Sequence, residues 1–203
     1  RNTAVGNFAL RNNTTNYNTA VGAYALDANT TGGCNVALGD FALRCNTTAN
    51  GNTGLGRQAL QENTTGTFNT AVGLRALRLN TTGQQNTSVG YSALGANTTG
   101  TFNTAVGTNS LKNNTTGRQN TAVGVNSMLC STESLFNVAV GYQASCAITT
   151  ARRNTAVGWS SLRNATSGGC NTALGAEALK ANTAGGNTAV GALALCANTT
   201  AGN

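Results

Sequence analysis

The chain has 203 residues and a formal net charge of +7, with no His, no Pro and five carboxylates. Aromatic residues make up 5% of it and charged residues 8%, whereas Asn, Thr, Ala and Gly dominate. So few large apolar groups exclude a thick globular core, and the modest charge separates the chain from disordered polar tracts. The remaining architecture is a thin core repeated many times, which is a solenoid.

One unit recurs along the whole sequence. A representative copy reads Asn-Thr-Ala-Val-Gly over 69–73, continues with Ala76-Leu77 and closes with Asn-Thr-Thr-Gly over 80–83. Twelve glycines align the copies at steps of 17 residues, with 16 at the first and last steps. A fixed period of this length determines the architecture. The aligned glycines are Gly6, Gly22, Gly39, Gly56, Gly73, Gly90, Gly107, Gly124, Gly141, Gly158, Gly175 and Gly191.

The first element expected in each unit is a short strand, as over 69–73. Asn stands four residues before every aligned glycine, a small residue two before it, and Val or Leu one before it. Period-two alternation places Thr and Val on one face and Asn, Ala and Gly on the other. Because Val36 and Val138 replace the Thr, we expect that face to be partly dry. The small residue suits either a tight core or the close approach of a neighbouring chain.

The second element expected is another short strand at Ala76-Leu77, because Leu recurs four residues after the glycine in ten units. The Asn-Thr-Thr-Gly run that follows has turn chemistry, since Asn and Gly accept positive φ. Large rings are confined to the bends, as two closely spaced sheets require. The sequence therefore predicts an all-β fold, a parallel β-solenoid (β-roll) of twelve coils with about 17 residues each. Residues 1–203 are expected to form one domain and a piece of a longer fibre.

The Asn-Thr-Ala-Val-Gly block resembles the head repeat of trimeric autotransporter adhesins, whose unit reads roughly Ser-Val-Ala-Ile-Gly. It is also similar to longer Asn-Thr-Ala-Val-Gly-x-x-Ala-Leu arrays in tail-fibre-like proteins of phages, viruses and bacteria. The resemblance covers the whole chain and implies a left-handed β-roll, often trimeric, in a surface-exposed fibre. The unit here is longer than the adhesin unit, so its second turn must differ. No stalk, anchor or chaperone segment is visible.

The Asn and Gly columns are expected to be structural. Stacked amides can hydrogen-bond from coil to coil, and a recurring glycine marks a backbone conformation or a close approach that a Cβ would block. A ligand-binding role for the Asn column is the less favoured alternative. Representative ladder positions are Asn18, Gly22, Asn69, Gly73, Asn103 and Gly107.

Six basic residues share the position five after the glycine, and they suggest a stripe. It is either a site for an anionic glycan or a solubilising edge that deters association between sheets, and we favour the edge. Nucleic acid is not expected, because no aromatic column interleaves the stripe and no reader motif is present. The stripe comprises Arg11, Arg44, Arg78, Lys112, Arg163 and Lys180.

The Asn-Thr-Thr runs match the N-glycosylation pattern, although turn chemistry alone explains them. Glycans on consecutive coils about 4.8 Å apart would collide, so we do not expect full occupancy, and sparse N-glycans or O-glycans on the Thr column are the open alternatives. The Thr columns also raise an ice-binding alternative, although ice binders typically present Thr-x-Thr on a flat strand rather than Thr-x-Val. The candidate acceptors are Asn29, Asn46, Asn63, Asn80 and Asn97.

The six cysteines all fall in predicted bends. Cys130 and Cys146 occupy nearly matching positions in neighbouring units, which suits a disulfide, and Cys34 with Cys45 is a weaker pair. Disulfides would indicate an oxidising, extracellular setting. Zinc is not expected, because there is no CxxC pair and no His. No cofactor is expected either.

Catalysis is not expected, because His is absent and the five carboxylates fall in different units. Residues 130–153 depart most from the repeat, so a local site, if present, is expected there. No apolar run approaches the roughly 20 residues of a membrane span. We expect a structural or adhesive segment of an extracellular or virion-surface fibre, forming a homotrimer or filament with a cell-surface glycan or receptor as partner. The alternative is a solenoid that binds glycans or ice.

Overall fold

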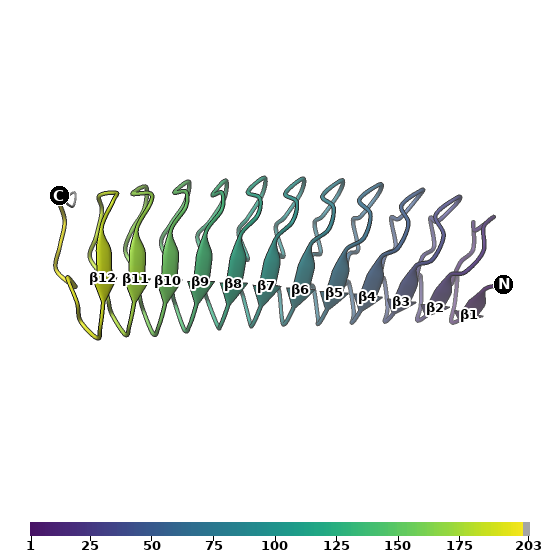
Figure 1. Ribbon diagram of the computed structural model, residues 1–203. Helices are drawn as coiled ribbons and strands as arrows, with labels where there is room; N and C mark the ends of the chain where they lie inside the picture. The colour runs from purple at the N-terminus through teal and green to yellow at the C-terminus, as the bar shows by residue number, and fades with distance from the viewer. Residues whose placement is uncertain (201–203) are drawn as a thin grey trace.

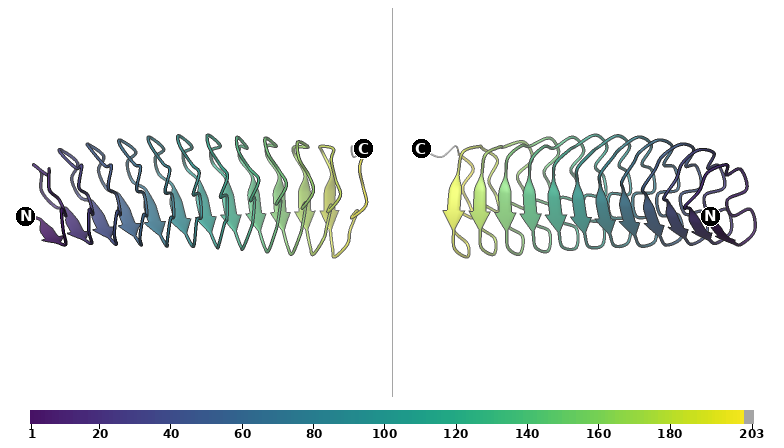
Figure 2. Two further views of the ribbon diagram at one scale, coloured as in Figure 1. Left: turned by 180° about the vertical axis from the view of Figure 1, so that it is seen from behind. Right: turned by 45° about the vertical axis from the view of Figure 1, so that its right-hand side comes forward.

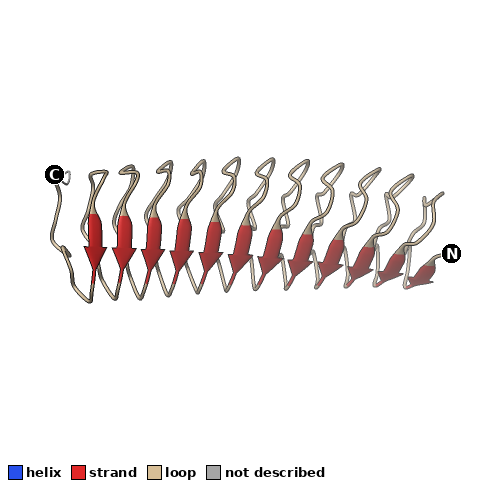
Figure 3. Ribbon diagram, viewed as in Figure 1, coloured by secondary structure: helices blue, strands red, loops and turns tan. Residues whose placement is uncertain are grey.

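In the computed structural model, which describes residues 1–200, the chain winds into a row of stacked coils (Figure 1). Its strands form one parallel sheet in sequence order. They lie along one side of the row and turns form the rest of each coil, without any helix in the described part (Figure 3). The strands are β1 (Thr3–Val5), β2 (Thr19–Val21), β3 (Val36–Leu38), β4 (Thr53–Leu55), β5 (Thr70–Val72), β6 (Thr87–Val89), β7 (Thr104–Val106), β8 (Thr121–Val123), β9 (Val138–Val140), β10 (Thr155–Val157), β11 (Thr172–Leu174) and β12 (Thr188–Val190).

The register of the sheet stacks identical unit positions on one another. Thr70 of β5 pairs with Thr87 of β6, and Val72 pairs with Val89. The same pairing runs from β1 to β12, and the row of coils twists gradually along its length (Figure 2). The predicted β-solenoid with one unit per coil is confirmed. Its left-handedness stays a prediction, and residues 201–203 lie outside the described part.

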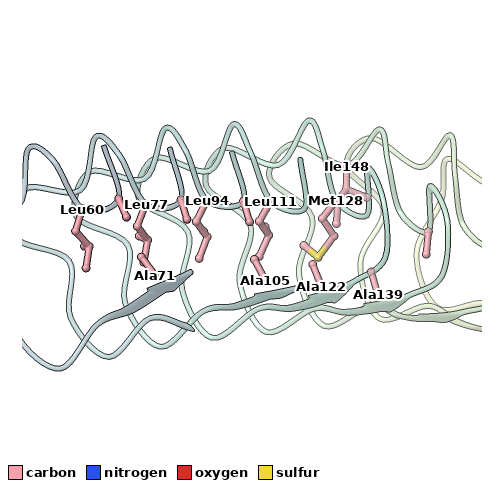
Figure 4. Packing of buried hydrophobic residues seen from close by; sticks show 14 of the residues in the cluster. Leu60, Ala71, Leu77, Leu94, Ala105, Leu111, Ala122, Met128, Ala139 and Ile148 are labelled. Carbon is pink, nitrogen blue, oxygen red and sulfur yellow. The ribbon is translucent and has the colours of Figure 1, made fainter. Parts of the chain in front are cut away.

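The core is a thin line of Ala and Leu side chains inside the coils (Figure 4). Ala71 in the middle of β5 and Leu77 from the following turn are both 0% exposed, as are their equivalents in most coils. Burying each Leu contributes about 1.5–3 kcal/mol. Met128 takes the Leu position after β8. After β9 this position is Ser145, and Ile148 packs into the core instead.

The small residue in the middle of each strand therefore serves the core. Its side chain points inward, where only a small group fits beside the Leu column. The alternative in which it admits a neighbouring chain is wrong, because Ala71 has no exposed surface. The Thr and Val side chains of each strand point outward instead, and Val89 and Val106 are each 36% exposed.

The expected second strand at Ala76-Leu77 is wrong. Arg75 and Leu77 have φ angles of 61° and 50°, and this alternation recurs in the other coils. Left-handed residues interrupt the extended backbone that a strand requires. The segment is nevertheless bonded from coil to coil, because the Leu77 N–H donates to the Ala93 carbonyl at 3.0 Å. Each coil thus has one strand and a long hydrogen-bonded turn.

Candidate functional site

The Asn before each strand builds a buried ladder along the solenoid. The Asn69 N–H donates to Oδ1 of Asn52 at 2.9 Å, and the Asn86 N–H donates to Oδ1 of Asn69 at 3.0 Å. The Asn69 Nδ2 also donates to the Gly83 carbonyl at 2.9 Å, which ties the strand to the turn that closes the coil. These atoms are fully engaged, so the column is structural. The same bonds recur at the other two predicted positions, Asn18 and Asn103.

The glycine after each strand permits the coils to stack. Gly73 has a φ of 131°, and a Cβ placed on it would lie 2.6 Å from the Gly90 carbonyl oxygen of the next coil. Both the conformation and the close approach expected from the sequence are therefore present at this position. Gly22 and Gly107, with φ angles of 136° and 127°, are equivalent.

The predicted glycosylation acceptors form a second buried ladder. Nδ2 of Asn80 donates to Oδ1 of Asn63 at 2.8 Å and to the Gly83 carbonyl at 2.9 Å. A glycan would have to occupy this nitrogen, which has no solvent access, so the prediction is wrong for the folded coil. Sequons with an exposed Asn side chain occur at Asn113 and Asn164. The predicted acceptors for which glycosylation is wrong are all 0% exposed: Asn29, Asn46, Asn63, Asn80 and Asn97.

The basic stripe is partly neutralised by neighbouring acids. Nε of Arg11 lies 2.9 Å from Oδ1 of Asp27, which occupies the same column one coil further along. Nζ of Lys180 lies 2.8 Å from Oε1 of Glu177. These are the ion pairs of residues 1–200, so the remaining four basic side chains of the stripe face solvent without an acidic partner.

Aromatic rings stack beside the N-terminal part of the stripe. The Phe8 and Tyr24 ring centroids are 5.1 Å apart, and those of Tyr24 and Phe41 are 5.3 Å apart. The Arg11 guanidinium lies 4.7 Å from the Phe8 centroid, and that of Arg44 lies 5.6 Å from the Phe41 centroid. These contacts fix the cations over the rings.

A cationic hollow lies in the middle of the stripe. Arg78 and Lys112 stand on either side of Gly95, whose missing side chain leaves a space of about 190 Å³. Arg75 and Tyr91 complete the walls, and no carboxylate lines the space. This arrangement can receive a small anionic group, and the choice between a glycan site and a solubilising edge stays a prediction.

The cysteines are free thiols in this structure. Cys130 and Cys146 are neighbours, because the Cys130 N–H donates to the Cys146 carbonyl at 3.0 Å. Burial raises the pKa of the Cys146 thiol, and the adjacent Cys130 adds to the shift. The disulfide between them stays a prediction.

The weaker pair is not supported by the contacts. Cys45 Sγ donates to Glu62 Oε2 at 3.5 Å, and Cys34 is exposed ahead of β3. Burial, followed by the Glu62 charge, raises the pKa of the Cys45 thiol. A disulfide between Cys34 and Cys45 would require the Cys45 thiol to give up its hydrogen bond to Glu62.

A larger hollow of about 420 Å³ lies ahead of strands β9 to β11. Two of its walls are Phe136 and the Arg152-Arg153 pair, which belong to the irregular stretch 130–153. Ser167 and Cys170 lie outside that stretch and were not expected to contribute. The signal available in the sequence was the single Arg-Arg pair of the chain.

Metal binding and helical membrane insertion find no support in the described residues. Within residues 1–200, His, Cys, Asp and Glu side chains do not gather in groups of three or more that would hold a metal ion. The same residues contain no helix with the length and apolarity to cross a membrane.

The comparisons leave the family open. No protein-family model matches the chain, and neither the curated proteins nor the solved structures include a match. The adhesin-like and fibre-like repeat resemblance therefore remains an expectation from the motif, and function is inferred from geometry.

Proposed function

We propose that this solenoid is a stiff structural and adhesive segment of an extracellular or virion-surface fibre. The observation that supports it most is the unbroken register of β1 to β12, reinforced by a buried Asn ladder that extends to Asn187. When every coil bonds only to its neighbours, length grows with repeat number and stiffness comes from the shared bonds. In this role, the polar side chains inside the coils serve construction rather than catalysis.

The outward face of the sheet is the surface on which fibre chains meet in this proposal. It consists of Thr and Val columns without a charged residue, and Leu38 and Leu174 are 49% and 47% exposed on it. Extended uncharged apolar surface of this kind commonly marks an interaction site. A second copy of the chain fits best, because its identical coil spacing lets the columns match rung by rung.

Native mass spectrometry at micromolar concentration tests the multi-chain fibre. We expect an oligomer, and we expect the double variant Val89→Lys/Val106→Lys to run as a single chain, because charge on the face opposes its burial. Leu74→Lys is the matched control, since Leu74 is 41% exposed but lies in a turn away from the face. A single-chain mass for the unmodified protein would refute the multi-chain proposal.

Binding of an anionic glycan is a second candidate, supported by the hollow between Arg78 and Lys112. Retention on an anionic glycan array should fall in Arg78→Gln/Lys112→Gln and persist in Arg1→Gln, an exposed cation at the N-terminal end of the row. Retention that is equal in all three proteins would exclude this hollow as the site.

Ice binding is the third candidate, because the Thr side chains of the strands stack in register on the outward face. The turn Thr residues do not contribute, since their hydroxyls are used between coils, as in the 3.1 Å bond from Thr81 to the Thr98 carbonyl. Measurable thermal hysteresis that is lost in Thr87→Lys would support it, and absence of hysteresis would remove it.

A further inference from the structure

We propose that the hollow ahead of β9 to β11 binds an acidic sugar residue, one that carries a carboxylate or a sulfate. This site is separate from the basic stripe and does not depend on the fibre proposal. Three successive coils line it: Phe136 precedes β9, Arg152 and Arg153 precede β10, and Cys170 precedes β11. Its volume of about 420 Å³ falls within the usual range for small-molecule sites.

Glycines let the backbones of successive coils approach closely beside the hollow. A Cβ on Gly169 would lie 2.8 Å from the Arg152 carbonyl oxygen, and a Cβ on Gly185 in the next coil would lie 2.6 Å from the Gly169 oxygen. Neither position accepts a side chain without moving backbone. The equivalent positions in the preceding coils, Leu135 and Arg152, carry large side chains, so the column of side chains at this position ends at Gly169, which lines the hollow.

The electrostatics favour an anion. Arg152 and Arg153 are both exposed, and neither is within ion-pair distance of an acid in residues 1–200. Arg118 adds a third cation on the same edge, because bridges link Arg118 to Leu135 and Leu135 to Arg152. Glu133 is the acid nearest in sequence, but it is exposed and forms no ion pair with them. Paired guanidinium groups suit the planar or tetrahedral oxygens of a carboxylate or sulfate.

Unused backbone donors surround the same space. In a regular coil, the N–H groups of Thr82 and Gly83 donate to the Thr98 carbonyl at 3.2 Å. The corresponding N–H groups of Thr150, Ala151 and Ser167, which line the hollow, donate to no acceptor within the described residues. Clustered amides without a protein acceptor form anion-binding concavities. At Ser167 the interruption coincides with the shortened unit that follows, where the glycines are 16 residues apart, whereas Thr150 and Ala151 are followed by a full unit.

The aromatic wall makes a sugar the fitting carrier of the anion. The Phe136 residue is 48% exposed at the edge of the hollow. Its ring provides an apolar surface for the C–H face of a sugar, while the hydroxyls of Thr150 and Ser167 can bond sugar hydroxyls. A bare inorganic anion would leave that ring unused.

Protection of Cys170 from alkylation tests the proposal, and Cys34 supplies an internal control. Both thiols are exposed and occupy the position five residues before an aligned glycine. The same position one coil earlier is Arg153 for Cys170 but Tyr17 for Cys34. The full chain is treated with neutral iodoacetamide, and the rate at each thiol is read by peptide mass spectrometry. The probes are glucuronate and galactose 6-sulfate, with glucose, galactose and inorganic sulfate as controls.

We expect either acidic sugar to slow Cys170 alkylation about five-fold when it is present at about four times its dissociation constant. The Cys34 rate should stay unchanged, and the preferred probe will distinguish carboxylate from sulfate. Protection should disappear in Arg152→Gln/Arg153→Gln and weaken in Phe136→Ala, but persist in Arg57→Gln. Unchanged far-UV circular dichroism and Trp159 emission in each variant show that the coils remain folded, since Trp159 lies just after β10.

Several results would overturn the proposal: no protection by either acidic sugar, equal protection by neutral sugars, or protection that survives the double Arg substitution. Protection by inorganic sulfate equal to that by the sugars would exclude a saccharide site. None of these outcomes bears on the native mass, so this inference and the fibre proposal fail independently.

Discussion

Removing a single rung of the Asn ladder should destabilise the solenoid far beyond the loss of one surface polar group. Asn69→Ala deletes both bonds that Oδ1 accepts from Asn86, at 3.0 and 3.1 Å, and both that Nδ2 donates, to Gly83 and Asn52. The Asn86 N–H is then left buried without an acceptor. Gly83 keeps its bond from Asn80, so only one backbone group is orphaned.

The magnitude follows from these contacts. The orphaned buried N–H costs about 1–3 kcal/mol and the other three lost bonds about 1 kcal/mol each, which gives a total of about 4–6 kcal/mol. Thr70→Ala is the matched control, because Thr70 is adjacent on the same strand and its side chain faces outward. We expect it to change the free energy of unfolding by less than about 1 kcal/mol.

Urea unfolding followed by two signals will measure the effect. Far-UV circular dichroism reports the whole rod, whereas Trp159, 51% exposed beside β10, reports the C-terminal part. Because coils interact only with neighbours, a weakened interface lets the two halves unfold separately. We expect the two curves to coincide in Thr70→Ala and to separate in Asn69→Ala. Coincident curves and free energies within about 1 kcal/mol of each other would falsify the ladder's structural role.

Three further outcomes are expected. Gly73→Ala should lower the free energy of unfolding by about 3 kcal/mol or more, since its Cβ would lie 2.6 Å from backbone. Gly186→Ala should lower it far less, because no atom lies within 4 Å of its Cβ. Similar melting temperatures for the two variants would contradict this. In urea titrations, Leu77→Val should destabilise the protein by about 2 kcal/mol more than Leu77→Met, because a β-branched residue resists a φ of 50°. Met is tolerated there, since Met128 already adopts this φ. Equal losses of stability would contradict the left-handed backbone of this turn. The raised pKa of Cys146 keeps its thiol neutral to higher pH, so its alkylation midpoint should lie above that of the same thiol in the urea-unfolded chain; a midpoint at or below it would contradict the assigned burial.

The strand and its stacking could be predicted from the sequence because their causes are local and repeated. Alternation over 69–73 identifies the strand, and the fixed period forces like positions such as Thr70 and Thr87 into register. The inward Asn and Ala and the outward Thr and Val follow from the same alternation. The alternation could not show which face of the sheet a second chain would contact in the proposed fibre.

The long turn was mistaken for a strand because Ala76-Leu77 resembles a short apolar run. A usable signal was present: the positions of Arg75 and Leu77 never carry a β-branched residue in any unit. That exclusion is the signature of positive φ in residues other than glycine. Burial of the second Asn ladder was missed for a related reason, since Asn80-Thr81-Thr82 matches both an exposed sequon and an inward turn.

The hollow beside Phe136 lay largely beyond sequence reasoning. It depends on the alignment of three coils and on a single missing residue in the next unit, and neither acts within a short stretch of sequence. Arg152 and Arg153 draw attention by themselves, but their meeting with Ser167 and Cys170 requires the rise and register of the stack.

The Asn ladder also makes the coils interchangeable. Each rung presents one carbonyl oxygen to the strand above and takes one from the strand below, as Asn69 does between Asn52 and Asn86. If a unit were duplicated or excised, the coils on either side could therefore form the same ladder bonds with their new neighbours. Each added unit would lengthen the row by about 4.8 Å and leave its two sides the same.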